Sequence, residues 1–202
     1  EHYEKKCWIF NYNYNLKFIE IWKINIEIKP NHLGGYESLE IIDNGHGLEY
    51  SKGQEIFGKL GGSEKKTKNQ SPKGRSYHGK EGKGRYKSLA IGDLVTYTST
   101  YKNSNNSKEF TIVLDRNNLS HSKFSEPKTV TSNDKNSGVS VLIENTNSEI
   151  VHQIYDEKNR KELSQKFASY WINYRDFNIY INNKKLEFEY YFYIIKCLGN
   201  YS

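Results

Sequence analysis

Residues 41–48 read Ile-Ile-Asp-Asn-Gly-His-Gly-Leu, and the predicted fold follows from this stretch. An apolar run ends in a single carboxylate, Asp43, and two glycines, Gly45 and Gly47, follow one residue apart. A carboxylate at the end of a strand can accept a hydrogen bond from an exocyclic amine such as that of adenine. Glycines let the backbone turn beneath a flat base and approach it closely. The pattern therefore indicates a purine site, with an ordinary Asp-Asn-Gly turn as the alternative interpretation.

A second glycine cluster lies further along the chain, at residues 79–85. Its three glycines, Gly79, Gly82 and Gly84, directly precede an apolar run that is compatible with a helix. Glycine-rich backbone at the start of a helix exposes N–H groups and the positive end of the helix dipole to phosphate. The cluster is not a Walker A loop, because Lys83 is followed by glycine instead of Ser or Thr. The flanking sequence likewise fits neither a kinase glycine-rich loop nor a dinucleotide-binding turn.

Strands dominate the rest of the chain. Apolar and polar side chains alternate in the second half of residues 15–28, which predicts a half-buried strand paired in a hairpin with the run ending at Asp43. The other expected strands are residues 94–101, 110–115 and 139–144, and the expected helices are residues 49–60, residue 83 to a stop at Gly92, and residues 157–174. A final hairpin is expected to pair residues 177–181 with 186–188 across Asn182-Asn183. The predicted fold class is α+β, a two-layer sandwich of a mixed sheet with helices on one face.

The composition is that of a single folded domain. The chain has 202 residues, a mean hydropathy of −0.87 and 14% aromatic residues, so much of its core must be aromatic. The two cysteines, Cys7 and Cys197, form no CxxC pair, and neither a zinc site nor a disulfide framework is predicted. We interpret His46 and His78 as solvent-facing, and we assign no metal ligands. Without a long apolar run or a signal-peptide pattern, the chain is expected to be cytoplasmic and to make no membrane contact.

The order and spacing of the two glycine clusters resemble the ATP-binding domain of the superfamily that joins gyrase B, Hsp90, histidine kinases and MutL (GHKL). Asp43, Gly45 and Gly47 match its D-x-G-x-G box, and residues 79–84 match its second glycine box. This resemblance implies a Bergerat-type fold. It also implies that the polar, basic segment 61–78 is a lid loop over the nucleotide.

The resemblance extends over about residues 15–190 and points to one branch of the superfamily. Gly62-Ser63 and Lys65-Lys66 resemble an element that precedes the lid in the Hsp90-, MORC- and MutL-like branch. Residues 1–190 are accordingly expected to form the ATP-binding domain. Residues 191–202 are expected to be a tail or the start of a following segment.

The resemblance also implies which residues contact ATP and Mg²⁺. Asp43 contacts adenine, Gly45 and Gly47 line the base pocket, and Leu48 lies beneath it. The second glycine turn wraps the phosphates, and basic side chains neutralise their charge. The implied nucleotide-binding residues are Asp43, Gly45, Gly47, Leu48, Ser63, Lys66, Gly79, Gly82, Gly84, Arg85, Lys87 and Ser140.

Two departures from the family pattern bear on catalysis and on the base pocket. The family carries Glu and, four residues later, Asn on a helix upstream of the first box, but no such pair precedes Asp43. The chain contains no Met, and we expect it to begin just beyond that helix; no catalytic residue is therefore assigned. Where the family has Gly-Thr at the start of a late strand, this chain has Gly138-Val139-Ser140, so Ser140 is expected to substitute for the Thr.

Two classes of function follow from the sequence. The first is the ATP-binding domain of a GHKL-type ATPase, in which nucleotide drives lid closure and homodimerisation within a larger protein that handles nucleic acid. The second is a non-catalytic module that binds nucleic acid through the basic region 61–87. A net charge of +6 and a pI of about 9.0 fit an anionic partner of either kind. A histidine kinase is a third interpretation, although no phosphoacceptor histidine in a dimerising helix precedes Asp43.

Overall fold

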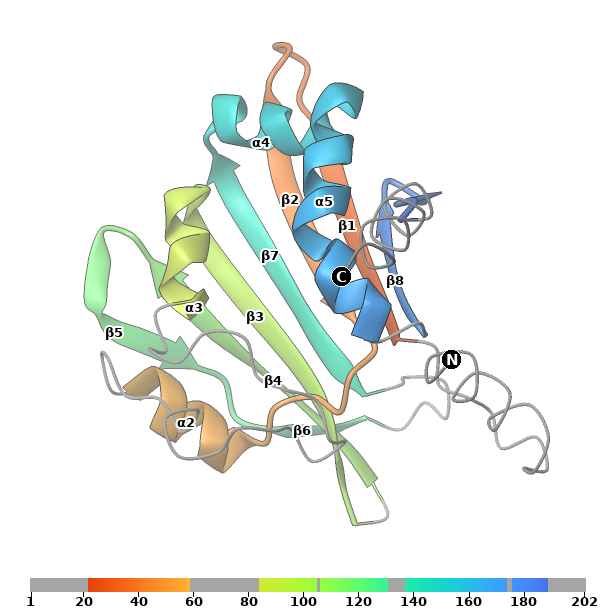
Figure 1. The fold of residues 1–202 in the computed structure, drawn as a ribbon. Helices are drawn as coiled ribbons and strands as arrows, with labels where there is room; N and C mark the ends of the chain where they lie inside the picture. The colour runs from red at the N-terminus through yellow and green to blue at the C-terminus, as the bar shows by residue number, and fades with distance from the viewer. Residues whose placement is uncertain (1–21, 59–83, 105, 131–136, 174–175, 189–202) are drawn as a thin grey trace, which may run out of the picture.

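The structure is a computed structural model that describes residues 22–58, 84–104, 106–130, 137–173 and 176–188. Its centre is one large twisted sheet (Figure 1). The strands in the described part of the chain run in the spatial order β5-β4-β3-β7-β2-β1-β8-β9, with β6 paired to β4. Their bounds are β1 (Trp22–Pro30), β2 (Tyr36–Asp43), β3 (Gly92–Asn103), β4 (Asn106–Asp115), β5 (Asn118–Phe124), β6 (Lys128–Val130), β7 (Gly138–Thr146), β8 (Phe177–Ile181) and β9 (Lys184–Lys185).

The sheet is mixed, as predicted. Strands β1 and β8 pair in parallel, and every other pair among the described strands is antiparallel. The hairpin predicted to end at Asp43 is β1–β2, in which Asp43 lies opposite Ile24. Strand β2 lies between β1 and β7, well inside the sheet. Asp43 therefore stands at the end of an inner strand.

The helices lie on one face of the sheet, which confirms the two-layer prediction (Figure 1). They are α2 (Tyr50–Gly58), α3 (Gly84–Lys87), the 3₁₀ helix η2 (Ser88–Ala90), α4 (Ser148–Tyr155) and α5 (Glu157–Asn173). In the figure, α2, α3 and α5 stand in front of the sheet, and α4 follows the end of β7. Among the described residues, no helix combines the length and the apolar character that crossing a bilayer requires.

The pleat of the strands determines which side chains form the core. Leu39, Ile143, Val95 and Leu114 lie opposite one another across β2, β7, β3 and β4, and all four are buried. Side chains two residues apart on a strand share a face. Asp43 is an even number of residues from Leu39, so its carboxylate belongs to the same, helix-covered face. The sequence thus places one acid at the edge of an apolar layer.

Several predicted elements differ from the observed ones. Asn182 and Asn183 do form the last turn, with positive φ angles of 44° and 64°. The partner strand is Lys184–Lys185, however, and beyond it the Leu186 N–H donates to the Ile179 carbonyl at 2.8 Å. The pairing therefore begins two residues earlier than predicted and extends to Leu186, the first residue of the predicted range 186–188.

Gly92 opens a strand where a helix stop was predicted. It is the first residue of β3 and pairs with Thr146 of β7. A Cβ at this position would overlap the carbonyl oxygen of Glu144, so a close approach of β7 requires glycine here. The helix expected before it is short and ends in the 3₁₀ turn η2.

Candidate functional site

Asp43 is oriented through one of its two carboxylate oxygens. Its Oδ1 accepts the N–H of Gly45 at 2.7 Å and the N–H of Val139 at 3.3 Å. Within the described residues, no hydrogen bond reaches Oδ2. The carboxylate is thus fixed by backbone groups of the following turn and of β7, and its second oxygen remains available to accept a hydrogen bond.

The pKa of Asp43 is raised above its ordinary value of 3.8. Burial is the largest cause, because a low-dielectric surrounding disfavours the charged form. The N–H groups of Gly45 and Val139 and the nearby His46 act in the opposite direction without cancelling this effect. A partly desolvated carboxylate with a vacant oxygen is suited to a ligand that donates a hydrogen bond.

The turn after Asp43 requires glycine where two strands approach it. Gly47 has a φ of +73°, and a Cβ there would overlap the carbonyl oxygen of Thr100 on β3. A Cβ on Gly138, at the start of β7, would overlap the carbonyl oxygen of Asp43. Only a residue without a Cβ satisfies both the backbone angle and the contact at Gly47. Gly47 of the first box therefore allows β3 to pack directly on the turn, and Gly138 allows β7 to do so.

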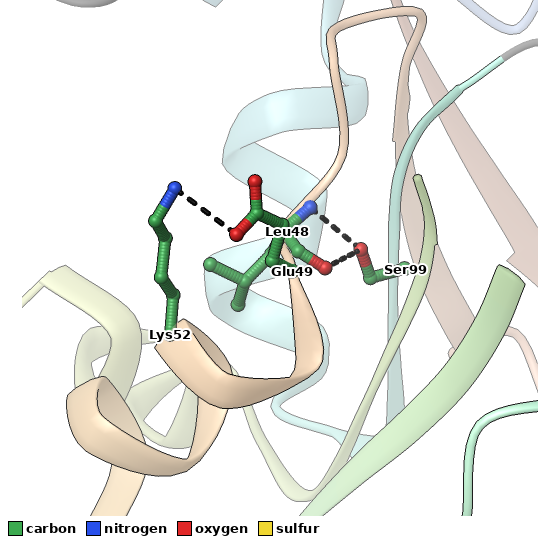
Figure 2. A network of polar contacts seen from close by, with 4 residues as sticks. All are labelled: Leu48, Glu49, Lys52 and Ser99. Atoms are coloured by element: carbon green, nitrogen blue, oxygen red, sulfur yellow. Dashed lines mark hydrogen bonds and ion pairs between the residues drawn. The ribbon is translucent and has the colours of Figure 1, made fainter. Parts of the chain in front are cut away.

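Two serine hydroxyls hold the same turn. The Ser137 hydroxyl donates to the carbonyl of Gly45 at 2.8 Å. The Ser99 hydroxyl accepts the N–H of Leu48 at 2.7 Å and donates to the Leu48 carbonyl at 2.9 Å (Figure 2). Neither serine was predicted as a site residue. Ser137 directly precedes Gly138, which is a weak sequence signal, and Ser99 gives none.

The turn leads directly into helix α2. Leu48 is half-buried against the core. Glu49 directly precedes the helix and forms an ion pair at 3.2 Å with Lys52, which lies in its first turn (Figure 2). Gly53 lets the helix approach β4, because a Cβ there would lie 3.0 Å from the Phe110 Cζ. Helix α2 therefore packs directly on the sheet, next to the turn of residues 43–48, which we call the acidic turn.

The end of α2 contacts the helix that follows the second glycine cluster. The Tyr86 hydroxyl of α3 donates to the Phe57 carbonyl at 3.4 Å, and the Ser122 hydroxyl of β5 donates to the same oxygen at 3.3 Å. The Phe57 ring also meets the Tyr97 ring edge-on at 5.0 Å. The two helices that flank residues 59–83 in the sequence are therefore held together.

The structure brings one part of the predicted nucleotide site together. Asp43, Gly45, Gly47 and Leu48 form the acidic turn described above. Gly84 and Arg85 lie in α3, and Lys87 ends that helix with an exposed side chain. The predicted residues Ser63, Lys66, Gly79 and Gly82 and the predicted lid at 61–78 lie outside the described residues.

Ser140 does not meet Asp43. It lies opposite Ile42 in the β2–β7 pairing, so its side chain points to the opposite face of the sheet from Asp43. Its hydroxyl donates to the carboxylate of Glu40. The β7 residue that does reach Asp43 is Val139, which contributes its backbone N–H alone. The prediction that Ser140 takes the place of the family's Thr beside Asp43 is therefore wrong.

The described residues supply no metal ligand set. Among them, no group of three or more His, Cys, Asp and Glu side chains could hold a metal ion. No protein ligand for Mg²⁺ is therefore assigned. Mg²⁺ in nucleotide sites is often held largely by phosphate oxygens and water, with few protein groups.

The fold is an α+β domain with a mixed sheet and helices on one face, and its candidate site is a half-buried acid followed by a glycine turn. The family model for the histidine kinase-, DNA gyrase B- and HSP90-like ATPase matches residues 20–149. This chain belongs to that family. A search of curated protein sequences gave no match.

Solved structures support the same fold. The chain is similar to the ATPase region of topoisomerase II from Saccharomyces cerevisiae, with 18% identity and a TM-score of 0.50, over 82% of this chain and 43% of that one. The same region bound to ICRF-187 (dexrazoxane) matches at 17% identity and a TM-score of 0.51, over 83% of this chain and 44% of that one. The chain thus spans less than half the length of these relatives. At such identities the likeness concerns the fold, and the Hsp90-, MORC- and MutL-like branch stays a prediction.

Proposed function

We propose that this chain is the ATP-binding domain of a larger GHKL-type ATPase. In this proposal, Oδ2 of Asp43 accepts a hydrogen bond from the exocyclic amine of adenine. The observation that carries it is the one-sided bonding of Asp43, whose Oδ1 holds two backbone N–H groups while Oδ2 accepts none among the described residues. Membership of the ATPase family gives this geometry its context.

The phosphates belong, in the same proposal, to the second glycine cluster. Gly79, Gly82 and Gly84 wrap them, and cationic side chains including Arg85 and Lys87 neutralise their charge. Support comes from α3, which begins at Gly84 and is tied through Tyr86 to the helix that follows the acidic turn. Mg²⁺ would accompany ATP and would supply positive charge at the phosphates, with few protein ligands.

Nucleotide binding also has a proposed consequence for the whole protein. We infer that ATP·Mg²⁺ closes the segment 61–78 over the site and promotes homodimerisation of the intact protein. The family supports this inference, since the chain contains the segment in the expected place between the two glycine clusters. Sedimentation of the intact protein with a non-hydrolysable ATP analogue tests it, and a mass that stays monomeric contradicts it.

Calorimetry with ADP and a non-hydrolysable ATP analogue tests the proposed site. Asp43→Asn should weaken binding by about tenfold to a hundredfold, because the amide places an N–H₂ where a charged acceptor met the base amine. The matched control is Glu40→Gln, which alters an acid of the same strand that bonds Ser140, a residue on the other side of the sheet from Asp43. Equal affinities for Asp43→Asn and the unmodified chain would contradict the proposal.

The competing proposal is a nucleic-acid-binding module that uses the basic region 61–87. The net charge of +6 is the observation in its favour. Titration with a DNA duplex at several salt concentrations separates the two. A module of this kind loses affinity steeply as salt rises and is unaffected by Asp43→Asn.

A further inference from the structure

Two serines outside the predicted site hold the turn that carries Asp43. We propose that Ser137 and Ser99 are positioning residues for nucleotide binding, which fix this turn so that the free carboxylate oxygen keeps one direction. The inference rests on the proposed function and deepens it, because it names the groups that pre-form the base pocket.

The acidic turn cannot fix itself. Gly45 and Gly47 have no side chains, and glycine backbone has more conformational freedom than any other residue. Asp43 nevertheless depends on this turn, since its Oδ1 accepts the N–H of Gly45 at 2.7 Å. If the backbone at Gly45 rotates, that bond is lost and the carboxylate turns with it.

Ser137 restrains the backbone at Gly45 from the other side. Its hydroxyl donates to the Gly45 carbonyl at 2.8 Å, while the Gly45 N–H is bound to Asp43. The two bonds fix both peptide units that flank the Gly45 α carbon. Gly45 is buried, so without Ser137 its carbonyl would lose its hydrogen-bond partner among the described residues.

Ser99 restrains the far end of the turn in the same way. Its hydroxyl bonds both the N–H and the carbonyl of Leu48, at 2.7 and 2.9 Å (Figure 2). Ser99 is only 2% exposed and lies opposite Val139 in the β3–β7 pairing. Val139 is also the residue whose N–H reaches Asp43. The adjacent strands β7 and β3 therefore hold the two ends of the turn: β7 bonds Asp43 through Val139, and β3 bonds Leu48 through Ser99.

A turn fixed in advance spares the ligand the cost of ordering it. Ser137→Ala should therefore weaken ADP binding by about tenfold, the effect expected for one lost hydrogen bond. Ser137→Thr keeps the hydroxyl and should restore most of the affinity. Ser125→Ala is the matched control, because Ser125 also bonds a backbone group, the Thr111 N–H at 2.9 Å, but its partner lies in β4 and not in the turn.

Hydrogen exchange provides a readout that does not require nucleotide. The amide of Gly45 should exchange about tenfold faster in Ser137→Ala than in the unmodified chain, while amides of β4 should not change. Ser99→Ala should act in the same direction on the Leu48 amide. A general loss of stability would instead speed exchange throughout the sheet.

The outcomes separate this inference from the proposed function. If Ser137→Ala binds ADP as tightly as Ser125→Ala and its Gly45 amide exchanges normally, while Asp43→Asn loses binding, the positioning role is wrong and the site stands. If Asp43→Asn keeps full affinity, the proposed site fails irrespective of the serines. Faster exchange at Gly45 together with weaker binding that Ser137→Thr restores supports the inference.

Discussion

Asp43 and Ser140 show how the pleat of a strand decides which polar residues enter the site. Both occur at strand ends beside glycines, and from the sequence both were assigned to the base pocket. Asp43 lies on the helix-covered face, whereas Ser140 follows Val139 and faces the other side, where it meets Glu40. A shift of one residue along a strand reverses the face. The sequence contains the motif, but the register between β2 and β7 appears only in the fold.

The raised pKa of Asp43 predicts a pH-dependent cost to stability. Folding raises this pKa above 3.8, so the folded chain holds the proton more tightly than the unfolded chain does. The stabilisation from protonated Asp43 is present below about pH 3.8 and is lost as the pH rises through the higher folded pKa. Relative to Asp43→Asn, the free energy of unfolding should therefore fall over that window and stay level above it.

Urea denaturation of both proteins between about pH 3 and 7 measures this difference. Glu40→Gln serves as the control. If the difference between the unmodified chain and Asp43→Asn is flat across the window, burial does not shift the Asp43 carboxyl.

Gly47→Ala should be among the most damaging single-methyl changes in the turn. The substitution places a Cβ against the Thr100 carbonyl oxygen at a positive φ, and we expect a loss of about 2–4 kcal/mol in the free energy of unfolding. Gly34→Ala is the matched control. Gly34 also has a positive φ, of 81°, but a Cβ there would have no atom within 4 Å, so about 1–2 kcal/mol is expected.

Denaturant unfolding of the two variants compares the cost of the backbone angle with the cost of the close contact. Similar losses for Gly47→Ala and Gly34→Ala would show that the turn can move away from β3, contrary to the close packing of Gly47 on Thr100.

At the scale of elements, the spacing of apolar residues in the sequence predicted the strands and the helix that bury a continuous apolar stripe. The hairpin β1–β2, the strands β3, β4 and β7, and helix α5 were all anticipated. In α5, Leu163, Phe167 and Trp171 recur at helical spacing and pack against the core. Each of these elements has a recognisable spacing of apolar residues in its own sequence, because each presents one face to the same core.

The elements that were missed depend on their neighbours. Strand β5 is largely polar and is defined by pairing with β4, where Phe124 lies opposite Ile112. Strand β6 has three residues. Helix α4 is short, and its apolar run is ambiguous between helix and strand. Its start was nevertheless marked by Asn147, whose side chain caps the N–H groups of Glu149 and Ile150.

At the scale of the whole molecule, the sequence predicted the fold class and the turn that follows Asp43, but it did not predict the serines that bond this turn. The α+β sandwich, the mixed sheet and the acidic turn all follow from the first glycine box and the strand periodicity. The roles of Ser99 and Ser137 at that turn were not predicted from the sequence, because a serine that bonds the backbone has no sequence pattern that distinguishes it from a surface serine. The second glycine box stays a prediction for the residues that lie outside the described ranges.

In the proposed function, recognition of the base depends on an amine that donates to the free oxygen of Asp43. The ratio of calorimetric dissociation constants for inosine diphosphate and ADP tests this contact. The two ligands differ at the atom proposed to contact the carboxylate, since inosine places a carbonyl where adenine has its amine. We predict that ADP binds at least about tenfold more tightly, because two acceptors facing each other leave both unsatisfied. Equal affinities for the two nucleotides would show that Asp43 does not read the base amine.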